Sequence, residues 1–330
     1  MPMNPRVRHL EAIVMLLLAN LLWGISFPTI KALTMLHAQL LPEAGTWFSA
    51  IYTVAPRFVL ATLILVVMQG RGFWRITKGE WQQGTAIGVF SAVGMLLQND
   101  AIQFTEASTS AFLTQFYAIL IPLVLAVRSR RSPGARVWLC CGLVLAGVAI
   151  LGRFKWDSMS FDRGEAETLL ASVFFMGQIL CLGWARFAGN RPLKITLVMF
   201  AVQALIFSAL AGVVAPSLET LMLPWTSLPW LGLTLILTVF CTVGAFTLMN
   251  TWQPKITTTE AGLIYCAEPI FGSAMALFMP VMFSVWAGIN YANETATLSL
   301  IVGGALITGA NVLMQLRPPE VTLPGGSAQS

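Results

Sequence analysis

The stretch AIVMLLLANLLWGISFPTIKAL (residues 12–33) holds a single charged side chain, Lys31, in 22 residues. At a helical rise of about 1.5 Å per residue, such a run is long enough to cross ~30 Å of hydrocarbon. The preceding segment, MPMNPRVRHLEA, leads into it without a small-residue cleavage signature. We therefore predict a retained first transmembrane helix, and not a removed signal peptide.

The composition extends this prediction to the whole chain. Of its 330 residues, 57% are hydrophobic and 10% are charged, whereas a soluble domain carries about 25% charged residues. The formal net charge is +5, but the Lys and Arg residues are divided among the segments between apolar runs. Binding of nucleic acid needs them gathered on one face, so the expected partners are a lipid bilayer and a small-molecule substrate, without nucleic acid.

Apolar runs of about 17 to 25 residues mark the expected membrane crossings. They predict an all-α integral membrane protein with about ten transmembrane helices. The stretch 280–293 is either an interfacial segment or an extension of the ninth helix. The ten runs are 12–33, 47–69, 81–103, 107–127, 137–152, 168–185, 195–214, 229–252, 256–279 and 295–316.

The distribution of Lys and Arg between alternate loops tests this number of crossings, because positive residues collect on the cytoplasmic side. One side holds fourteen and the other holds three, Arg153, Lys155 and Arg163. A miscounted helix would exchange every later loop between sides and remove the asymmetry. We predict a multi-pass protein of a bacterial inner membrane with both termini in the cytoplasm. The fourteen are Arg6, Arg8, Arg71, Arg75, Lys78, Arg128, Arg130, Arg131, Arg136, Arg186, Arg191, Lys194, Lys255 and Arg317.

The two halves of the sequence resemble each other in register. AVGMLLQNDAIQFTEASTSAFL (92–113) aligns with TVGAFTLMNTWQPKITTTEAGL (242–263), and GLVLAGV aligns with GALITGA in the fifth and tenth runs. A unit of five helices crosses the membrane an odd number of times, so its tandem copy is inverted, as in many secondary transporters. We expect one five-helix unit at 1–154, a second at 155–316 and a disordered cytoplasmic tail at 317–330. Gly142, Gly147, Gly304 and Gly309 in the last pair are expected to allow close helix packing.

Signatures of other chemistry are missing from the sequence. It contains no HExxH, GxSxG, Walker A or CxxC pattern, so we expect no enzyme activity, no metal site and no cofactor. The cysteines all fall inside apolar runs and are interpreted as packing residues. They are Cys140, Cys141, Cys181, Cys241 and Cys266.

Three segments, together with Arg57 and the paired glycines, resemble the EamA type of the drug/metabolite transporter superfamily. They are WGISFPTIK (23–31), SAFLTQFYAILIPL (110–123) and EAGLIYCAEPIFGSAMAL (260–277). The resemblance covers nearly the whole chain as two EamA-like units. It implies ten helices, an inverted repeat, a central cavity lined mainly by helices 1, 3, 4, 6, 8 and 9, and transport of amino acids, other metabolites or drugs. One departure is that Pro122 and Pro269 lie at different distances after the aligned Ala111 and Ala261.

Polar groups inside the apolar runs are the candidates for function, because they are costly in lipid and usually face a cavity or a partner. Asn20, Trp23, Phe27 and Lys31 follow a helical stripe, which is either one wall of a site or aromatic packing between helices. For Lys31 three interpretations are open: it extends to the lipid headgroups, it pairs with an acidic residue, or it binds a substrate carboxylate. Arg57, midway along its run, has a buried partner or a gating role.

Glu268 is the most informative acid, because it lies near the middle of its run just before Pro269. It is suited either to proton coupling or to a fixed structural pair. Glu260 and Asp100, nearer to helix ends, are expected to be solvated caps. Further candidates for hydrogen bonds to substrate, in addition to Asn20, Trp23 and Phe27, are Gln98, Asn99, Gln115, Tyr117, Gln178, Asn250 and Tyr265.

These features favour a secondary transporter or facilitator that moves a small polar or amphipathic metabolite, an amino acid-like compound or a drug, as an exporter by alternating access. The protein is expected to be a monomer or a homodimer. Two alternatives remain from the sequence. One is an intramembrane lipid-processing enzyme that uses Glu268 or Asp100 with Arg57. The other is a non-transporting membrane receptor.

Overall fold

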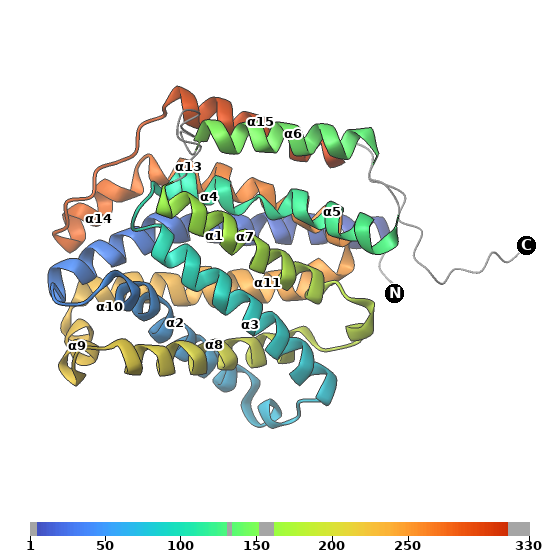
Figure 1. Cartoon of the computed structure of the whole chain (residues 1–330). Coiled ribbons are helices and arrows are strands. Elements are labelled where there is room, and N and C mark those ends of the chain that lie inside the picture. The colour runs from blue at the N-terminus through green and yellow to red at the C-terminus, as the bar shows by residue number, and fades with distance from the viewer. Residues whose placement is uncertain (1–4, 131–133, 152–161, 316–330) are drawn as a thin grey trace, which may run out of the picture.

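The computed structural model describes residues 5–130, 134–151 and 162–315, and within these ranges the chain is helical and contains no strand (Figure 1). The expected boundary between the units at residues 154 and 155, and the expected tail at 317–330, lie outside the described residues. The helices lie roughly along one common direction (Figure 1). A bundle of this kind satisfies the backbone polar groups inside each helix, as a lipid environment demands.

The first half of the chain supplies helices α1 to α6. Helix α1 is longer than the apolar run 12–33 that predicted it, since it continues for seven residues beyond each end of that run. A short 3-10 helix, η1, follows α2. The bounds are α1 Pro5–Leu40, α2 Thr46–Gln69, η1 Gly70–Trp74, α3 Lys78–Ala101, α4 Ala107–Thr114, α5 Tyr117–Ser129 and α6 Ala135–Leu151.

The second half is divided into shorter elements. Its long helices are α7 Arg163–Leu182, α8 Pro192–Val214 and α15 Leu298–Gln315. Between them lie α9 Leu218–Met222, α10 Leu228–Ile236, the π-helix η4 Leu237–Gly244, α11 Ala245–Trp252, α12 Thr258–Ile264, η6 Tyr265–Ala267, α13 Glu268–Ala276 and α14 Met279–Ala287. Short 3-10 turns complete the set, with η2 Ala185–Phe187, η3 Leu223–Thr226 and η5 Gln253–Lys255.

Several of these helices are able to cross a membrane. Within the described residues, six helical stretches are long and apolar enough, and α12 to α14 form a further candidate that is bent by 53° before α14. Helix α14 begins at Met279, directly after the bend. The apolar residues after position 280 therefore belong to a separate short helix. Two shorter apolar helices are Trp138–Gly147 and Leu298–Ala310. The six are His9–Leu40, Thr46–Gly72, Ala107–Arg128, Arg163–Leu182, Pro192–Val214 and Leu228–Lys255.

Two helices that the sequence predicts as continuous are interrupted in the structure. The expected helix 107–127 breaks between α4 and α5 at Gln115 and Phe116, and the expected helix 256–279 breaks at η6. Pro269 contributes to the second break, because it lacks an N–H and its ring clashes with the carbonyl four residues earlier, that of Tyr265. The last residues before the two breaks, Thr114 and Ile264, are 150 positions apart.

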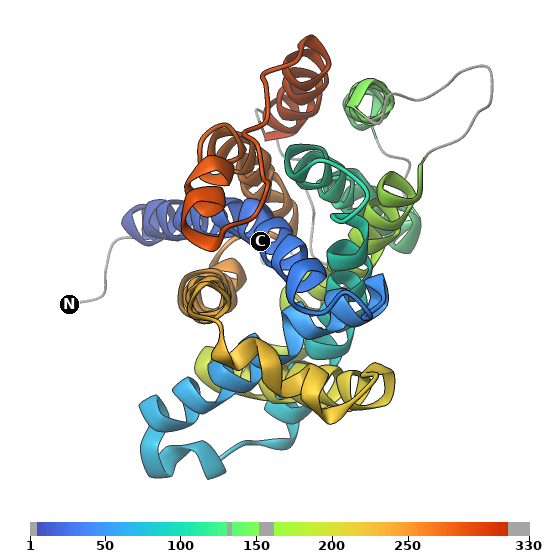
Figure 2. The same cartoon turned by 90° about the vertical axis from the view of Figure 1, so that its left-hand side faces the viewer.

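The halves are packed into each other. Helix α3 lies against α7 and α8, α2 lies against α8, and α1 lies against α11 and α13. Helices α6 and α15 pair with each other at one edge of the molecule (Figures 1 and 2). Elements from the two halves therefore share most of their contact surfaces.

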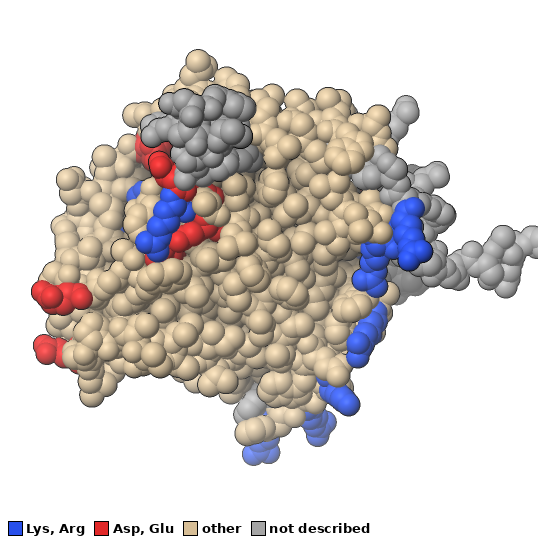
Figure 3. Space-filling view, viewed as in Figure 1, with Lys and Arg blue, Asp and Glu red and all other residues tan. Residues whose placement is uncertain are grey.

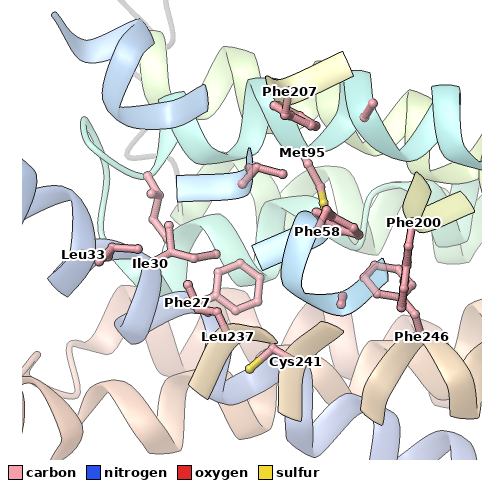
Figure 4. Packing of buried hydrophobic residues seen from close by; sticks show 14 of the residues in the cluster. Phe27, Ile30, Leu33, Phe58, Met95, Phe200, Phe207, Leu237, Cys241 and Phe246 are labelled. Carbon is pink, nitrogen blue, oxygen red and sulfur yellow. The ribbon is translucent and has the colours of Figure 1, made fainter. Parts of the chain in front are cut away.

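Aromatic rings fill the centre of the bundle (Figure 4). The centroid of the Phe58 ring lies 5.4 Å from that of Phe200, and the Phe200 centroid lies 6.2 Å from that of Phe246, both edge to face. Phe27 is 1% exposed and belongs to the same core. Edge-to-face packing of this kind adds about 0.5–1.5 kcal/mol per pair beyond the burial of area.

Candidate functional site

A central cavity of about 60 Å³ lies between the helices. Its walls come from both halves of the chain. The lining residues are Trp23, Ser26 and Ile30 of α1, Arg57 of α2, Met95, Gln98 and Asn99 of α3, Thr114 of α4, Tyr117 of α5, Phe175, Gln178 and Ile179 of α7, Phe246 and Met249 of α11, Tyr265 of η6 and Glu268 of α13.

One wall of the cavity is aromatic. The Trp23 ring centroid lies 5.3 Å from that of Phe246 and 5.7 Å from that of Tyr265, with both pairs edge to face. Such a wall presents ring faces and edges on which a planar or apolar group can pack. The Tyr265 hydroxyl donates to Gln253 Oε1 at 2.9 Å, and this bond fixes the orientation of its ring.

The two helix interruptions meet beside this cavity. Gln115, at the first break, donates from Nε2 to Oε2 of Glu268, just after the second break, at 3.2 Å. Gln98 Nε2 donates to Thr114 Oγ1 at 2.9 Å on the same side. Interrupted membrane helices expose backbone and side-chain polar groups where they line a cavity. The arrangement places a buried carboxyl group between the two halves.

Asn20 stabilises the second interruption from α1. Its Nδ2 donates to the carbonyl oxygen of Ile264, the last residue of α12, at 2.8 Å. That carbonyl lies at a helix end, where intrahelical partners run out. Asn20 is fully buried and is absent from the cavity lining.

Arg57 is held by the π-helix of the second half. The Nε atom of Arg57 donates to Thr242 Oγ1 at 2.9 Å, and the Thr242 hydroxyl donates to the carbonyl oxygen of Leu237, five residues earlier. A π-helix leaves wider spacing in the backbone ladder and often marks a functional position. Here it turns the Thr242 hydroxyl toward the cation on α2.

The residues proposed from the sequence fall into two groups. Those lining the cavity are Trp23, Arg57, Gln98, Asn99, Tyr117, Gln178, Tyr265 and Glu268. Gln115 is not among the lining residues but contacts Glu268. The other four, Asn20, Phe27, Lys31 and Asn250, do not line the cavity. Asn250 instead joins α11 to α8, because its Nδ2 atom donates to Thr196 Oγ1 at 2.9 Å.

The structure adds lining residues that the sequence reading did not name. A signal for some of them was available, since Gln178 and Ile179 lie three and four residues after Phe175, the spacings that place side chains on one helical face. The aliphatic and hydroxyl members gave no such signal, because they look like ordinary packing residues of an apolar helix. The added residues are Ser26, Ile30, Met95, Thr114, Phe175, Ile179, Phe246 and Met249.

One end of the bundle carries an ionic cluster near the short α4. Arg163 pairs with Asp100, whose carboxyl group is fully buried, and with Glu167 at 2.8 Å. The expectation that Asp100 is a solvated cap is therefore wrong, because Arg163 covers it. Lys31 donates to the carbonyl oxygen of Thr105, so it is held by the backbone of the neighbouring segment.

Two carboxylates act as caps at opposite ends of the molecule. Glu294 accepts from the backbone N–H of Ala107 at 2.8 Å, at the start of α4, and burial raises its pKa. Glu260 accepts from the backbone N–H of Thr257 at 2.9 Å, at the start of α12. The expected capping role of Glu260 thus matches the structure.

The opposite end of the bundle is basic. Lys and Arg side chains gather along the edge that lies on the right in Figure 3, while acidic groups lie toward the other end. Arg191 donates from Nε to Glu80 Oε1 at 2.6 Å, and this hydrogen bond raises the pKa of Arg191. The pair joins the first turn of α3 to the segment before α8.

The described residues contain no cluster of three or more His, Cys, Asp or Glu side chains able to hold a metal ion. The five cysteines are buried and unpaired with one another. The cavity offers groups suited to recognition: an aromatic wall, amide groups, a buried carboxyl group and a guanidinium group.

The EamA-like transporter family matches residues 10–153, which comprise α1 to α6 and most of the cavity lining from the first half. The chain is similar to this family over these residues, which make up less than half of its length. This match and the apolar helices together make it a multi-pass membrane protein. The expected resemblance to the EamA type of the drug/metabolite transporter superfamily is confirmed over residues 10–153.

One curated relative and one solved structure extend the comparison. An uncharacterized transporter from Archaeoglobus fulgidus is 26% identical over 174 residues, which are 52% of this chain. The alignment covers 49% of that relative, so the chain spans about half the length of the curated protein it matches. A solved crystal structure of a protein matches the fold with a TM-score of 0.57 and 17% identity, over 93% of this chain and 97% of that one.

Proposed function

We propose that this chain is a secondary transporter or facilitator of the EamA type that moves a small polar or amphipathic metabolite, an amino acid-like compound or a drug, across the membrane. The supporting observation is the central cavity, beside which both interrupted helices meet and are joined by the Gln115 to Glu268 hydrogen bond at 3.2 Å. A site at the junction of two halves can be exposed to either side as the halves rock against each other. We propose export by this alternating access.

The proposed architecture is ten membrane crossings in two inverted five-helix units, at 1–154 and 155–316. The positions of the breaks support it, because α4 and α12 end at Thr114 and Ile264, the 150-residue offset of the sequence alignment. The two breaks then occupy equivalent places in the units. Each places a helix end near the middle of the bundle, where transporters of this plan bind their substrates.

The proposed orientation puts the basic end of the bundle, with both termini, in the cytoplasm of a bacterial cell and the bundle in its inner membrane. The concentration of Lys and Arg at that end supports this orientation (Figure 3). Labelling of introduced cysteines at the two ends by an impermeant reagent tests it, and labelling of the basic end from outside the cell would reject it.

The proposed roles follow the position of each side chain. Trp23 and Tyr265 pack against the apolar part of the substrate, and Gln98, Asn99, Tyr117 and Gln178 supply hydrogen bonds. Glu268 couples the two halves, because its carboxyl group accepts from Gln115 of the first unit and faces the cavity. Protonation of Glu268 would weaken that bond and so link proton binding to the relative position of the halves.

The test is transport by the purified protein in liposomes, screened against amino acids, nucleosides, sugars and organic cations. We expect saturable flux of at least one class that a proton gradient alters. Glu268→Gln keeps a hydrogen-bonding group next to Gln115 but removes the titratable one. Under a proton gradient, the variant should transport at least roughly tenfold more slowly than the parent chain, a loss typical of one removed charge-assisted interaction. Its rate should also respond less to the gradient.

A matched control is Glu219→Gln, which changes an exposed carboxylate of α9 far along the chain from the lining residues. Its flux should equal that of the parent chain. Absence of flux for every class in the panel, with protein that is monodisperse and correctly inserted, would reject the transporter proposal.

A further inference from the structure

Arg57 is a buried cation without a matching anion. Its side chain is 1% exposed and it lines the central cavity. Its Nε atom is bonded to Thr242, but its Nη1 atom has no hydrogen-bond partner within the described residues. In the same part of the chain, Arg57 takes part in no ion pair. A buried guanidinium group left in this condition is costly, because its charge is neither solvated nor paired.

The carboxyl group that shares the cavity does not supply the missing partner. Glu268 is also buried and lines the cavity, and its hydrogen bond comes from Gln115. No ion pair within 4 Å joins it to Arg57 among the described residues. The cavity therefore carries two opposite charges that each face it separately.

The surroundings of Arg57 hold the guanidinium group in a fixed direction. Thr242 fixes the Nε edge from the π-helix η4, and the Phe58 ring lies with its centroid 5.3 Å from the Arg57 Cζ atom. A guanidinium group bound at Nε keeps its planar Nη edge for a second partner, and that edge matches the geometry of carboxylate and phosphate oxygens. On that edge, Nη1 is the atom left unpaired.

We infer that Arg57 is the anion-binding residue of the cavity and that the transported molecule carries a carboxylate or a phosphate group that binds its Nη atoms. This inference rests on the proposed transport function and names the substrate class for the same cavity. The apolar part of the molecule packs on the wall formed by Trp23, Phe246 and Tyr265. Thr242 is the positioning residue, because it aims the guanidinium group without touching the substrate.

The test uses four probes that share a phenyl ring and differ in the polar group: 3-phenylpropionate, phenyl phosphate, 3-phenylpropionamide and phenethylamine. Binding to the detergent-solubilised full chain is measured as a concentration-dependent rise in melting temperature, and flux is measured separately in liposomes. We expect one of the two anions to bind at least roughly tenfold more tightly than the neutral amide, as a hydrogen-bonded charge pair requires. The stronger of the two anions distinguishes a carboxylate substrate from a phosphate.

Arg57→Gln should lose the preference for the anion while leaving the affinity for the amide unchanged. Thr242→Val retains the charge and should show a smaller, still selective, loss. Arg71→Gln removes an exposed arginine of η1 and serves as the control, with binding equal to that of the parent chain. If Arg57→Gln is not monodisperse, the selective loss in Thr242→Val decides the matter.

The outcomes separate the two proposals. Equal affinity of the parent chain for anion and amide, or an equal loss of both in Arg57→Gln or Thr242→Val, would overturn the role of Arg57 even if the liposomes show transport. Anion binding that depends on Arg57 without flux of any probe or metabolite would support this inference and reject transport.

Discussion

His37 lies buried among aromatic rings between α1, α2 and α10. Its Nε2 atom accepts from Trp230 Nε1 at 2.8 Å, and its Nδ1 atom lies 3.0 Å from Ser49 Oγ. A neutral imidazole has one donor and one acceptor nitrogen. Because Nε2 accepts, Nδ1 carries the proton and donates to Ser49, and His37 is held in its neutral form.

Truncation of this side chain should destabilise the fold. His37→Ala leaves the buried Trp230 Nε1 group without an acceptor and opens a cavity in the core, which together cost about 2–4 kcal/mol. We expect the apparent melting temperature in detergent to fall by several degrees. The other histidine of the chain, His9, is exposed, so His9→Ala should leave the melting temperature unchanged. Equal effects of the two changes would contradict the assigned role of His37.

Single residues were predictable from the sequence where lipid makes them costly. Arg57 and Glu268 stand out because they interrupt apolar runs, and both line the cavity. The helical stripe of α1 was less informative, since Trp23 faces the cavity, whereas Asn20 bonds to Ile264 and Phe27 packs in the core. Side chains on several faces of this part of α1 are buried against other helices, so periodicity cannot assign a single functional face.

At the scale of helices, the paired glycines of α6 and α15 separate into two kinds. A Cβ atom added at Gly147 would lie 2.8 Å from the carbonyl oxygen of Gly303, and one at Gly304 would lie 2.6 Å from the Phe112 ring. Gly142 and Gly309 have no atoms within 4 Å of such a Cβ. The expectation of close packing holds for the first two and is wrong for the other two, because one face of each helix points away from its partner.

Gly147→Ala and Gly142→Ala should therefore change the stability in opposite directions. The first forces α6 and α15 apart and should cost about 1–3 kcal/mol. The second adds a favourable helix residue in open space and should contribute up to about 1 kcal/mol. Thermal melting of the two variants in the same detergent compares them. Destabilisation by both would show that α6 has a further partner on the Gly142 face.

Helix extents were predictable, and helix interruptions were not. Length and hydropathy located α2 and α8 within a few residues of their observed bounds, because membrane thickness fixes how long an apolar run must be. The break between α4 and α5 and the π-helix η4 depend on tertiary hydrogen bonds, such as that from Gln115 to Glu268. No local pattern in the sequence specifies such partners.

At the scale of the whole molecule, α3 carries an ion pair to the second half at each of its ends. Glu80 pairs with Arg191 at the basic end, and Asp100 pairs with Arg163 at the other end. Along its length, α3 packs against α7 and α8. The proposed rocking of one half against the other would separate these two ends in turn, and each pair would then stabilise the closed condition of its own end.

Removal of one pair should therefore shift the exposure of the cavity toward that end. Ser26→Cys places a thiol in the cavity lining with little change of shape. In the double variant with Ser26→Cys, Arg163→Gln should raise labelling of the thiol by an impermeant reagent outside intact cells severalfold. Loss of the ion pair shifts the equilibrium between the two exposures of the cavity toward the outside, and a modest change in free energy is enough for such a shift. Arg191→Gln should lower the labelling, because it favours opening to the cytoplasm.

Three further measurements make that experiment decisive. The parent chain, with its five buried cysteines, gives the background. Leu218→Cys, 73% exposed at the end of Asp100, should be labelled from outside, and Trp74→Cys, 79% exposed at the basic end, should not. Reversed labelling of these two would mean that the basic end faces outward. If the controls hold and both arginine changes alter the labelling of Ser26→Cys in the same direction, the ion pairs stabilise the fold without controlling access at the two ends. General loosening of the bundle would change access from both sides alike, whereas rocking must expose the cavity to one side as it closes it to the other.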